Sequence, residues 1–408
     1  MNESIKKRIE AVRQSEVPEG YRRTRAGLMP LDWQGNLAAK DVFRNYTNKK
    51  HNGEFQVLSA TQDRGIIPRS EVDIDIKFAE ENVGSYKKVD AGDFVISLRS
   101  FQGGIEYSEY EGLVSPAYTV LKATRPISEN YYRAYFKTPD FISRLNGAVY
   151  GIRDGKQIGY EDFGELAVHY PSLAEQRKIA EILATCDRMI ELKRQLLEEK
   201  RRQKQWLMQK LLDPDSGVRL PGFDGKWSTG SFSDVCTFIN GRAYKQEELL
   251  EEGKYPVLRV GNLFTKGDWY YSDMELPAHM YIDNGDLIYA WSASFGPQIW
   301  AGEKVIFHYH IWKVLLSDEV CKGYLYQYFL YDVDQLSREQ QGGTMAHITK
   351  ESMEKRVCKY PTITEQQRIA EVLDAADQDV LLTENDLESW QQKKKALMQL
   401  LLTGLVRV

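Results

Sequence analysis

Two long segments of the chain carry apolar residues at alternating spacings of four and three, and the second segment repeats the first. Residues 170–212 align without a gap with residues 360–402, which lie 190 positions later. Both contain Tyr-Pro, then Glu-Gln, then Ile-Ala and, near the end, Leu-Met-Gln-x-Leu-Leu. A four-three spacing is the a/d pattern of a coiled-coil helix. The pattern therefore predicts two matching long helices, each with one apolar seam.

Helix-start and helix-stop signals flank both segments. Residues 172–175 read Ser-x-x-Glu and residues 362–365 read Thr-x-x-Glu, which is the spacing of a capping box. No Pro or Gly interrupts either helical stretch, and each ends before a glycine, Gly217 or Gly404. Forty helical residues make a rod on the order of 60 Å long. Rods this long and this charged need each other or another protein to cover their apolar stripes, although packing on their own domains alone is the alternative.

The seam residues predict the coiled-coil or partner interface. These are Ile179, Leu183, Ile190, Leu197, Leu207, Leu211, Ile369, Leu373, Val380, Leu387, Leu397 and Leu401. Lys193, Lys200 and Lys204 also fall in the first seam, which predicts a weak middle. Apolar residues outside the first seam favour a surface for a second partner: Ile182, Leu192, Leu196 and Trp206.

The blocks before the two helices, about residues 20–165 and 220–355, read as short strands broken by turn residues. They echo each other weakly: residues 92–96 read Gly-Asp-Phe-Val-Ile, and residues 285–289 read Gly-Asp-Leu-Ile-Tyr. The chain thus repeats one arrangement, a variable block followed by a closely matching helix. This arrangement favours two related binding surfaces over one active site. The predicted divisions are residues 1–165 with a short N-terminal helix, 166–215, 216–357 and 358–408.

Composition and charge narrow the class of protein. The 408 residues are 42% apolar and 28% charged, which is typical of a chain with ample core material. No apolar run resembles a signal peptide or a membrane span. The four cysteines form no Cys-x-x-Cys pair, so we expect no zinc site, no disulfide framework and a cytoplasmic location. The net charge of −5 indicates that any DNA binding is local or shared with a basic partner.

Catalytic motifs are missing from the sequence. We find no GxxxxGK[ST] loop, no GxGxxG after a strand, no Asn/Asp-Pro-Pro-aromatic stretch and no helicase signature. Asp234, Glu252 and Lys254 could form a metal-nuclease trio, but such trios are common by chance. His308 and His310 share a face of a predicted strand without a third metal ligand. We therefore expect no catalytic residue, no metal and no bound cofactor.

Polar, basic and aromatic residues in the loops are the better candidates for a site. Arg and Lys can pair with guanine, Asn and Gln with adenine, and aromatic side chains can stack or wedge between bases. The predicted DNA-binding residues are Arg64, Arg99, Phe101, Gln102, Arg153, Lys156, Gln157, Arg259, Asn262, Lys266, Trp291, Ser292, Ser294, Gln298, Thr344, His347 and Lys350.

The repeated sequence of the two helices resembles the conserved regions of the specificity subunit of type I restriction–modification systems. The approaches to the two blocks are also similar to that family: Gly-Tyr-Arg-Arg-Thr at residues 20–24 before Trp33, and Arg-Leu-Pro-Gly-Phe at residues 219–223 before Trp227. So is the ending, Leu-Leu-Thr-Gly at residues 401–404 with Arg407 shortly after it. The similarity covers nearly the whole chain.

The resemblance implies an α+β fold with a pseudo-twofold internal repeat. Two β-rich α/β target recognition domains would be separated by two conserved helices that form an antiparallel coiled coil. Each domain would read one half of a bipartite, asymmetric site on double-stranded DNA. The helices would set the spacer and dock two methyltransferase subunits, which carry S-adenosylmethionine and the adenine-N6 chemistry. Restriction and translocase subunits would join the complex, and this chain would be non-catalytic.

Two rival functions remain open from the residues alone. The first is an adaptor, with two β domains on a coiled-coil stalk that bind protein ligands rather than DNA. The second is an enzyme that uses Asp234, Glu252 and Lys254. Salt-dependent affinity for duplex DNA would exclude the first, and cleavage by the isolated chain with magnesium, lost on Lys254→Ala, would favour the second.

Overall fold

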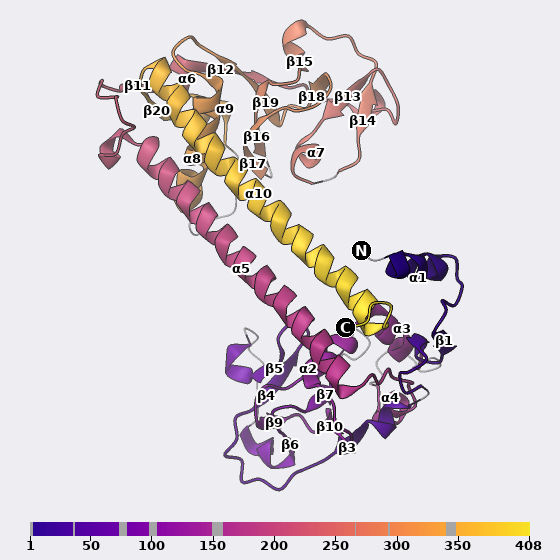
Figure 1. Cartoon of the computed structure of the whole chain (residues 1–408). Coiled ribbons are helices and arrows are strands. Elements are labelled where there is room, and N and C mark those ends of the chain that lie inside the picture. Colours follow the sequence, from indigo (N-terminus) through magenta and orange to yellow (C-terminus); the bar gives the residue numbers. More distant parts are fainter. Residues whose placement is uncertain are drawn as a thin grey trace. The chain divides into compact units, whose positions relative to one another are not determined.

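A computed structural model of the chain divides into two compact units, shown in Figure 1. Unit 1 comprises residues 1–192 and 387–408, and unit 2 comprises residues 193–386. The described residues are 3–35, 37–72, 80–97, 104–148, 158–265, 267–292, 294–339 and 348–408. The predicted α+β fold, with two β-rich blocks, two long helices and an internal repeat, is confirmed.

The two predicted long helices are present and nearly equal in length. Helix α5 spans Leu173–Leu211, which is 39 residues, and helix α10 spans Ile363–Leu402, which is 40 residues. The hydroxyl of Ser172 accepts a hydrogen bond from the Glu175 N–H at 3.2 Å and caps the first turn of α5. Both glycines that follow the helices, Gly217 and Gly404, take left-handed φ angles of 72° and 71°. The stop signals in the sequence therefore mark real changes of chain direction.

Unit 1 is built on a four-stranded antiparallel sheet in the order β3-β10-β7-β8. The strands are β3 Phe43–Tyr46, β10 Thr119–Ala123, β7 Phe94–Ile96 and β8 Ile105–Tyr107. Two-stranded ribbons join β1 Tyr21–Thr24 with β2 Gly27–Pro30, β4 Leu58–Thr61 with β5 Gly65–Pro68, and β6 Lys87–Val89 with β9 Gly112–Val114. The helices are α1 Glu3–Arg13, α2 Glu129–Tyr135, α3 Pro139–Gly147 and α4 Tyr160–Gly164.

Unit 2 repeats this sheet as β12-β19-β16-β17 and adds a second one, β14-β13-β18-β15. The strands of the first sheet are β12 Cys236–Asn240, β19 Ile311–Leu316, β16 Leu287–Ser292 and β17 Ser294–Ile299. Those of the second are β14 Tyr270–Ser272, β13 Tyr255–Leu258, β18 Val305–Phe307 and β15 Tyr281–Ile282. A ribbon pairs β11 Ser228–Ser231 with β20 Val357–Tyr360, and the helices are α6 Phe232–Val235, α7 Val260–Phe264, α8 Lys322–Glu339 and α9 Lys350–Glu354. In both units the strand after the Gly-Asp pair, β7 or β16, lies third in its sheet.

Each unit buries the beginning of one long helix and the end of the other in its own core. In unit 1, Ile179, Leu183 and Leu401 pack with the aromatic side chains of the sheet and of α2. In unit 2, the equivalent residues Ile369 and Leu373 pack with the end of α5 and with the aromatic residues of α8. The outer seam residues therefore pack into the core of a unit as well as against the other long helix.

The middle of the seam is held partly by ion pairs between α5 and α10. In unit 2 they are Lys193–Asp386, Lys200–Asp379 and Lys204–Asp377, and in unit 1 the pair is Lys394–Asp187. As the position along α5 rises, its partner on α10 falls, so the helices are antiparallel. The three lysines that predicted a weak middle thus have acidic partners. Ile190 and Leu197, both buried, supply the apolar packing beside them.

A charge-reversal cycle should detect this pairing. Lys200→Glu and Asp379→Lys each place like charges opposite each other, so each should lower the free energy of unfolding. The double variant restores an opposite pair and should recover about 1 kcal/mol of that loss. Urea unfolding of the four proteins measures the coupling. Strictly additive single effects would contradict the pairing, and a cycle on Glu199 and Arg202, an exposed pair within α5, is the control.

Among the described residues, no helix combines the length and the apolar composition that crossing a bilayer requires.

Candidate functional site

The predicted DNA-binding residues fall into two groups. Nine lie outside the described residues: Arg99, Phe101, Gln102, Arg153, Lys156, Gln157, Lys266, Thr344 and His347. The other eight are described at least in their backbone: Arg64, Arg259, Asn262, Trp291, Ser292, Ser294, Gln298 and Lys350. The second group supplies the geometry that follows.

The turn that begins α7 in unit 2 carries Arg259 and Asn262. The Asn262 side chain accepts a hydrogen bond from the Arg259 N–H at 3.0 Å and donates to the carbonyls of Gly267 at 3.0 Å and Asp268 at 3.3 Å. Both ends of this amide therefore hold the loop together. Arg259 is exposed, with its guanidinium 5.0 Å from the centre of the Tyr270 ring. Of the two predicted contacts, the arginine has the side chain that can reach a ligand without dismantling the turn.

Trp291 lies near the end of β16 in a fixed orientation. Its ring stacks on the buried Trp312 ring with centroids 5.8 Å apart and planes at 19°. Its Nε1 donates to the Tyr309 carbonyl at 2.8 Å. The His310 ring meets it edge-on at 5.1 Å. Because these three neighbours fix the indole, any stacking that it offers costs little side-chain entropy.

The β18–β19 loop, residues 308–310, adds a cluster of aromatic rings that the predicted site residues do not include. The ring centroids of His308 and His310 lie 4.9 Å apart, and the Tyr309 side chain between them in the sequence is exposed. Burial, with smaller contributions from His310 and Arg259, lowers the pKa of His308 to about 4, so its ring is neutral at neutral pH. We call Arg259, Trp291 and residues 308–310 the aromatic surface of unit 2. The signal for it was in the sequence as His-Tyr-His, which was weighed there only as a metal site and set aside for lack of a third ligand.

A close backbone approach positions this loop. The His308 N–H donates to the Leu258 carbonyl at 2.9 Å, which ties the loop to the strand that ends at Arg259. A side chain at Gly241 would bring its Cβ to 2.3 Å from the His308 carbonyl oxygen, so only glycine fits there. The sequence Asn-Gly-Arg at residues 240–242 is thus part of the aromatic surface's support.

The remaining described candidates in unit 2 lie elsewhere. Ser292 and Ser294 face each other across the β16–β17 hairpin, and Ser292 is buried. Gln298 is half-buried further along β17. Lys350 begins α9 and pairs with Glu354 at 3.5 Å. The structure does not gather these four residues around Arg259.

In unit 1, Arg64 sits in the turn between β4 and β5. It is exposed, and its guanidinium donates to the Glu71 carbonyl at 2.8 Å. The residues just before it line a cavity of about 510 Å³ together with β8, α2, α5 and α10. On its wall Glu106 is buried and pairs with Lys137 at 2.6 Å. Burial raises the pKa of Glu106 to about 7, because it disfavours the carboxylate more than Lys137 stabilises it.

Glu106 of unit 1 and Gln298 of unit 2 occupy matching places. Glu106 pairs in register with Val95 and Gln298 with Ile288, and these two partners are equivalent residues of the Gly-Asp strands. One unit therefore presents an acid where the other presents an amide. The related sheets carry different chemistry at the same position.

Two residues of the rival metal-nuclease trio, Asp234 and Lys254, have local structural uses. Asp234 accepts hydrogen bonds from the Ser231 N–H at 2.7 Å and hydroxyl at 2.8 Å and so caps α6. Lys254 pairs with Glu275. Among the residues that the structure describes, no group of three or more His, Cys, Asp and Glu side chains is arranged to hold a metal ion.

Comparison with known proteins gives one consistent result. The family model described as the type I restriction modification DNA specificity domain matches twice, at residues 33–200 and 224–389. The chain is 24% identical over 426 residues to the putative type I restriction enzyme MjaX specificity subunit of Methanocaldococcus jannaschii, covering 96% of this chain and 97% of the relative. It is 22% identical over 346 residues to the type I restriction enzyme MjaVIII specificity subunit of the same organism, covering 78% and 80%.

Solved structures share the fold. A chain described under the structural basis of complex assembly and conformational transition of the type I R-M system matches with a TM-score of 0.62 at 15% identity, covering 93% of this chain and 99% of that one. The S subunit of a type I restriction-modification system from M. genitalium matches with a TM-score of 0.53, also at 15% identity, covering 91% and 96%.

Proposed function

The chain belongs to the type I restriction modification DNA specificity family, as a specificity subunit, and we propose that each of its units reads one half of a split DNA site. The carrying observation is that the specificity domain occurs twice, once for each block with its helix. Two units with matching sheets and different side chains at matching positions, as at Glu106 and Gln298, favour two different half-sites. The target would then be asymmetric, and this subunit would choose the sequence without catalysing a reaction.

The aromatic surface is the part of unit 2 that we propose to face DNA. An exposed Arg259 can pair with guanine O6 and N7 or with phosphate, and bidentate pairing of this kind discriminates by about 1–3 kcal/mol per base. The immobilised Trp291 and the exposed Tyr309 offer flat apolar faces beside it. In unit 1, we assign the corresponding role to Arg64, which is exposed. The net charge of −5 supports phosphate contacts that are shared with partner subunits.

Methylation mapping tests this function directly. DNA is taken from cells that express the chain with its neighbouring methyltransferase subunit, and N6-methyladenine is located along it. We expect the mark only at a split, asymmetric motif and only when this chain is present. A folded and competent methyltransferase that leaves no such mark would exclude the function and favour a protein-binding adaptor.

We propose further that the long helices dock two methyltransferase subunits, which would bind S-adenosylmethionine and perform the adenine-N6 chemistry before restriction and translocase subunits join. Exposed apolar side chains on the helices support this. Leu192 of α5 and its repeat equivalent Leu382 of α10 are 52% and 64% exposed. Leu196 and Trp206 lie on the same flank of α5 as Leu192 and are exposed as well. An apolar flank on a charged helix is typical of a helix-packing surface.

Charges at the two equivalent leucines should lower the number of bound methyltransferases from two to one. Leu192→Glu should weaken one copy and Leu382→Glu the other, each at least ten-fold, because a carboxylate would be buried in an apolar contact. Native mass spectrometry of the assembled complex counts the copies. Glu198→Ala, an exposed change on the other flank of α5, should leave both in place. Two bound copies in each leucine variant would contradict the docking surface.

We also propose that the helices act as a ruler for the spacer between half-sites. Seven residues inserted into each helix preserve the a/d phase and add about 10 Å. At about 3.4 Å per base pair, the spacer should lengthen by at most about three base pairs, with both half-sites unchanged. Methylation mapping of the lengthened protein reports both quantities. An unchanged spacer in a complex that still methylates would exclude the ruler.

A further inference from the structure

The first turn of each long helix contains a buried carboxylate. Glu175 of α5 is 6% exposed and Glu365 of α10 is 2% exposed. They are equivalent residues of the internal repeat, and each belongs to the Glu-Gln pair that both segments share. A buried carboxylate is costly unless it is paired and hydrogen-bonded. The partners of these two residues are therefore informative.

Each carboxylate is paired by one arginine from beyond the end of the other long helix. Arg407, which follows α10, donates from Nε to Glu175 Oε1 at 2.6 Å and from a terminal nitrogen to Oε2 at 3.0 Å. Arg219, which follows α5, donates from Nε to Glu365 Oε1 at 3.0 Å and from a terminal nitrogen to Oε2. The geometry is the same in both units: a bidentate, side-on pair. We call these the Arg407 clamp and the Arg219 clamp.

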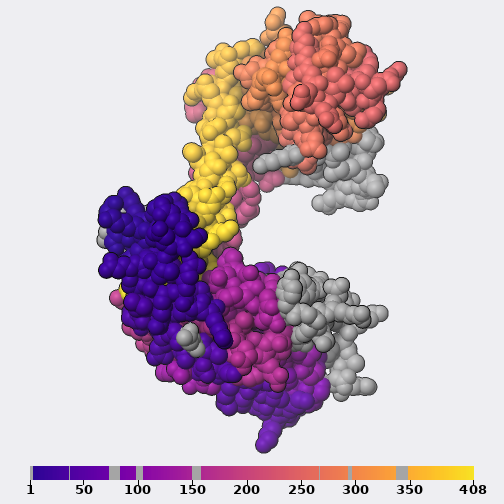
Figure 2. Space-filling model, turned by 90° about the vertical axis from the view of Figure 1, so that its right-hand side faces the viewer, coloured from indigo at the N-terminus to yellow at the C-terminus, as the bar shows by residue number. Residues whose placement is uncertain are grey.

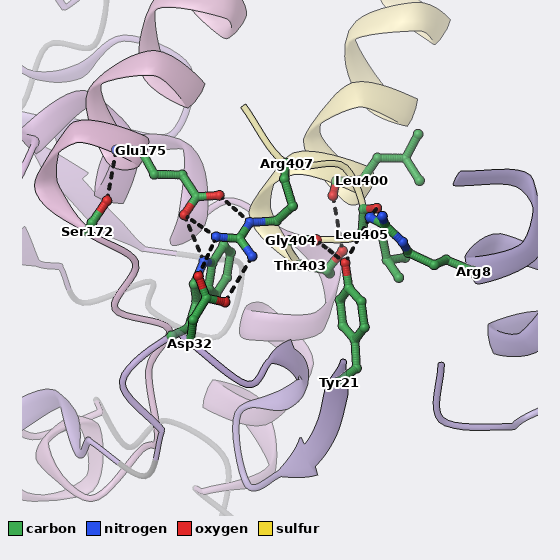
Figure 3. Close-up of polar contacts among 11 residues, drawn as sticks. Arg8, Tyr21, Asp32, Ser172, Glu175, Leu400, Thr403, Gly404, Leu405 and Arg407 are labelled. Atoms are coloured by element: carbon green, nitrogen blue, oxygen red, sulfur yellow. Dashed lines mark hydrogen bonds and ion pairs between the residues drawn. The ribbon is translucent and has the colours of Figure 1, made fainter. Parts of the chain in front are cut away.

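The Arg407 clamp includes further contacts, shown in Figure 3. Arg407 also donates to both carboxylate oxygens of Asp32, at 2.9 and 2.8 Å, and the Trp33 Nε1 donates to Glu175 at 2.9 Å. The hydrogen bond from Arg407 lowers the pKa of Asp32. Asp32, Trp33 and Glu175, which come from two distant parts of unit 1, are thus joined in one network around Arg407.

The chain before Arg407 is held closely enough to aim it. A side chain at Gly404 would bring its Cβ to 2.6 Å from Pro30 Cγ, and the residue already has a φ of 71°, so glycine is required twice over. The Tyr21 hydroxyl donates to the Gly404 carbonyl at 2.7 Å, and Arg8 donates to the Leu405 carbonyl at 3.0 Å. Figure 2 shows the indigo N-terminal residues covering the yellow end of α10. The clamp therefore has a fixed position.

The residue after each clamped glutamate connects the helix to the recognition sheet. Gln176 Oε1 accepts a hydrogen bond from the Ser128 N–H at 2.9 Å, just before α2. In unit 2, Gln366 Oε1 accepts one from the Cys321 N–H at 2.8 Å, just before α8. Both glutamines are fully buried. Within its unit, each clamp thus fixes the turn on which the sheet's covering helix is mounted.

We propose that Arg407 and Arg219 are matched positioning residues, each setting the accuracy with which its own unit, and only that unit, reads a DNA half-site. The inference rests on the proposed function. Neither arginine needs to touch DNA for this role. Recognition depends on base contacts placed within fractions of an ångström, and a displacement of about 1 Å can cost on the order of 100-fold in a positioned interaction. Loosening one clamp should therefore weaken recognition of one half-site and leave recognition of the other unchanged.

The test compares Arg407→Ala and Arg219→Ala in the full chain, assembled with its methyltransferase. We expect Arg407→Ala to lower discrimination against single-base changes by about ten-fold or more in one half of the motif, and Arg219→Ala to do so in the other. Glu175→Gln should reproduce the Arg407→Ala pattern, because it removes the charge and keeps the shape. Arg407→Lys should restore only part of the lost discrimination, because the lysine ammonium keeps the positive charge but cannot form the side-on pair. Arg201→Ala, which removes an exposed arginine with two ion pairs, should change neither half.

Hydrogen exchange supplies the readout for positioning alone. In Arg407→Ala we expect faster exchange at residues 128–135 and 173–180 and unchanged rates at residues 321–328 and 363–370, and the reverse in Arg219→Ala. Exchange that rises equally in both units, or discrimination that falls equally in both halves or in neither, overturns the inference. A wild-type chain that directs no methylation at a split motif overturns the proposed function instead, so the two failures are distinguishable.

Discussion

Replacing residues 220–355 with the matching block of a relative should replace one half of the methylated motif and leave the other half unchanged. This block supplies both sheets of unit 2 and its aromatic surface. The parts of unit 2 that stay behind include the end of α5, strand β20 and the start of α10, and both helix segments belong to the repeated sequence. Arg219 and Glu365, which form the Arg219 clamp, also lie outside the block. A transplanted block therefore packs on the same helix surfaces and beside the same Arg219 clamp that its own chain would provide.

The measurement is a methylation map of cells that express the hybrid with the original methyltransferase. The reciprocal replacement of residues 20–165 is the matched control, and it should change the other half. A hybrid that assembles and methylates a motif with both halves altered would contradict the independence of the two units. So would a hybrid with neither half altered, because sequence choice would then reside in the helices.

The two long helices could be predicted from the sequence because the information is local. Their apolar spacing, their capping residues and the glycines at 217 and 404 lie within the segments themselves, and the helices begin and end within a few residues of these signals. The repeat predicted two related units for the same reason. The partner of each helix was less accessible. A seam of Ile and Leu does not say whether it faces another helix or a domain core, and here Ile179 and Leu373 face a domain core.

The seam lysines show where a local pattern is incomplete. Lys193 and Lys200 on an apolar seam predict weakness only if nothing opposite them is acidic. The acids, Asp386 and Asp379, are 193 and 179 residues away, and antiparallel pairing places them opposite. Each such pair contributes little by itself when it is exposed, about 0–1 kcal/mol. Their constant register specifies alignment more than it adds stability.

The clamps were invisible to sequence reasoning for a related reason. Glu175 was interpreted as the far half of a capping box, and Arg407 as part of a family-like ending. Their pairing spans 232 residues and depends on the turn at Gly404. Charged residues near chain ends are usually solvated, so nothing local distinguished this arginine from its neighbours.

The candidate site was predicted in part and remains largely a prediction. Residue type alone favoured Asn262 as a reader of adenine, but its amide is used by the carbonyls of its own loop. Residue type also passed over the exposed Tyr309, which follows the close backbone approach between Gly241 and His308. For Asn262 the deciding quantity is the conformation of its own loop, and for the 308–310 loop it is the backbone position of Gly241. Composition cannot supply it, whereas the general placement of the loops followed from the repeat.

A charge introduced into the core of one unit should unfold that unit alone. Leu183 and Leu373 are equivalent residues of the repeat, and both are buried, one in each core. Replacing a buried leucine with a smaller residue costs about 2–5 kcal/mol, and an unpaired carboxylate in its place adds a desolvation penalty. We therefore expect Leu183→Asp to lower the free energy of unfolding of unit 1 by more than about 4 kcal/mol, and Leu373→Asp to do the same for unit 2.

Limited proteolysis with mass mapping distinguishes the two variants. Leu183→Asp should expose cleavage sites within residues 20–165 while residues 220–355 stay resistant, and Leu373→Asp should reverse the pattern. Leu196→Asp, on the exposed flank of α5, should leave both blocks resistant. If either buried change makes both blocks equally sensitive, the two cores are one cooperative unit. Half-sites could then no longer be assigned to separately folded readers, because loosening one reader would loosen the other.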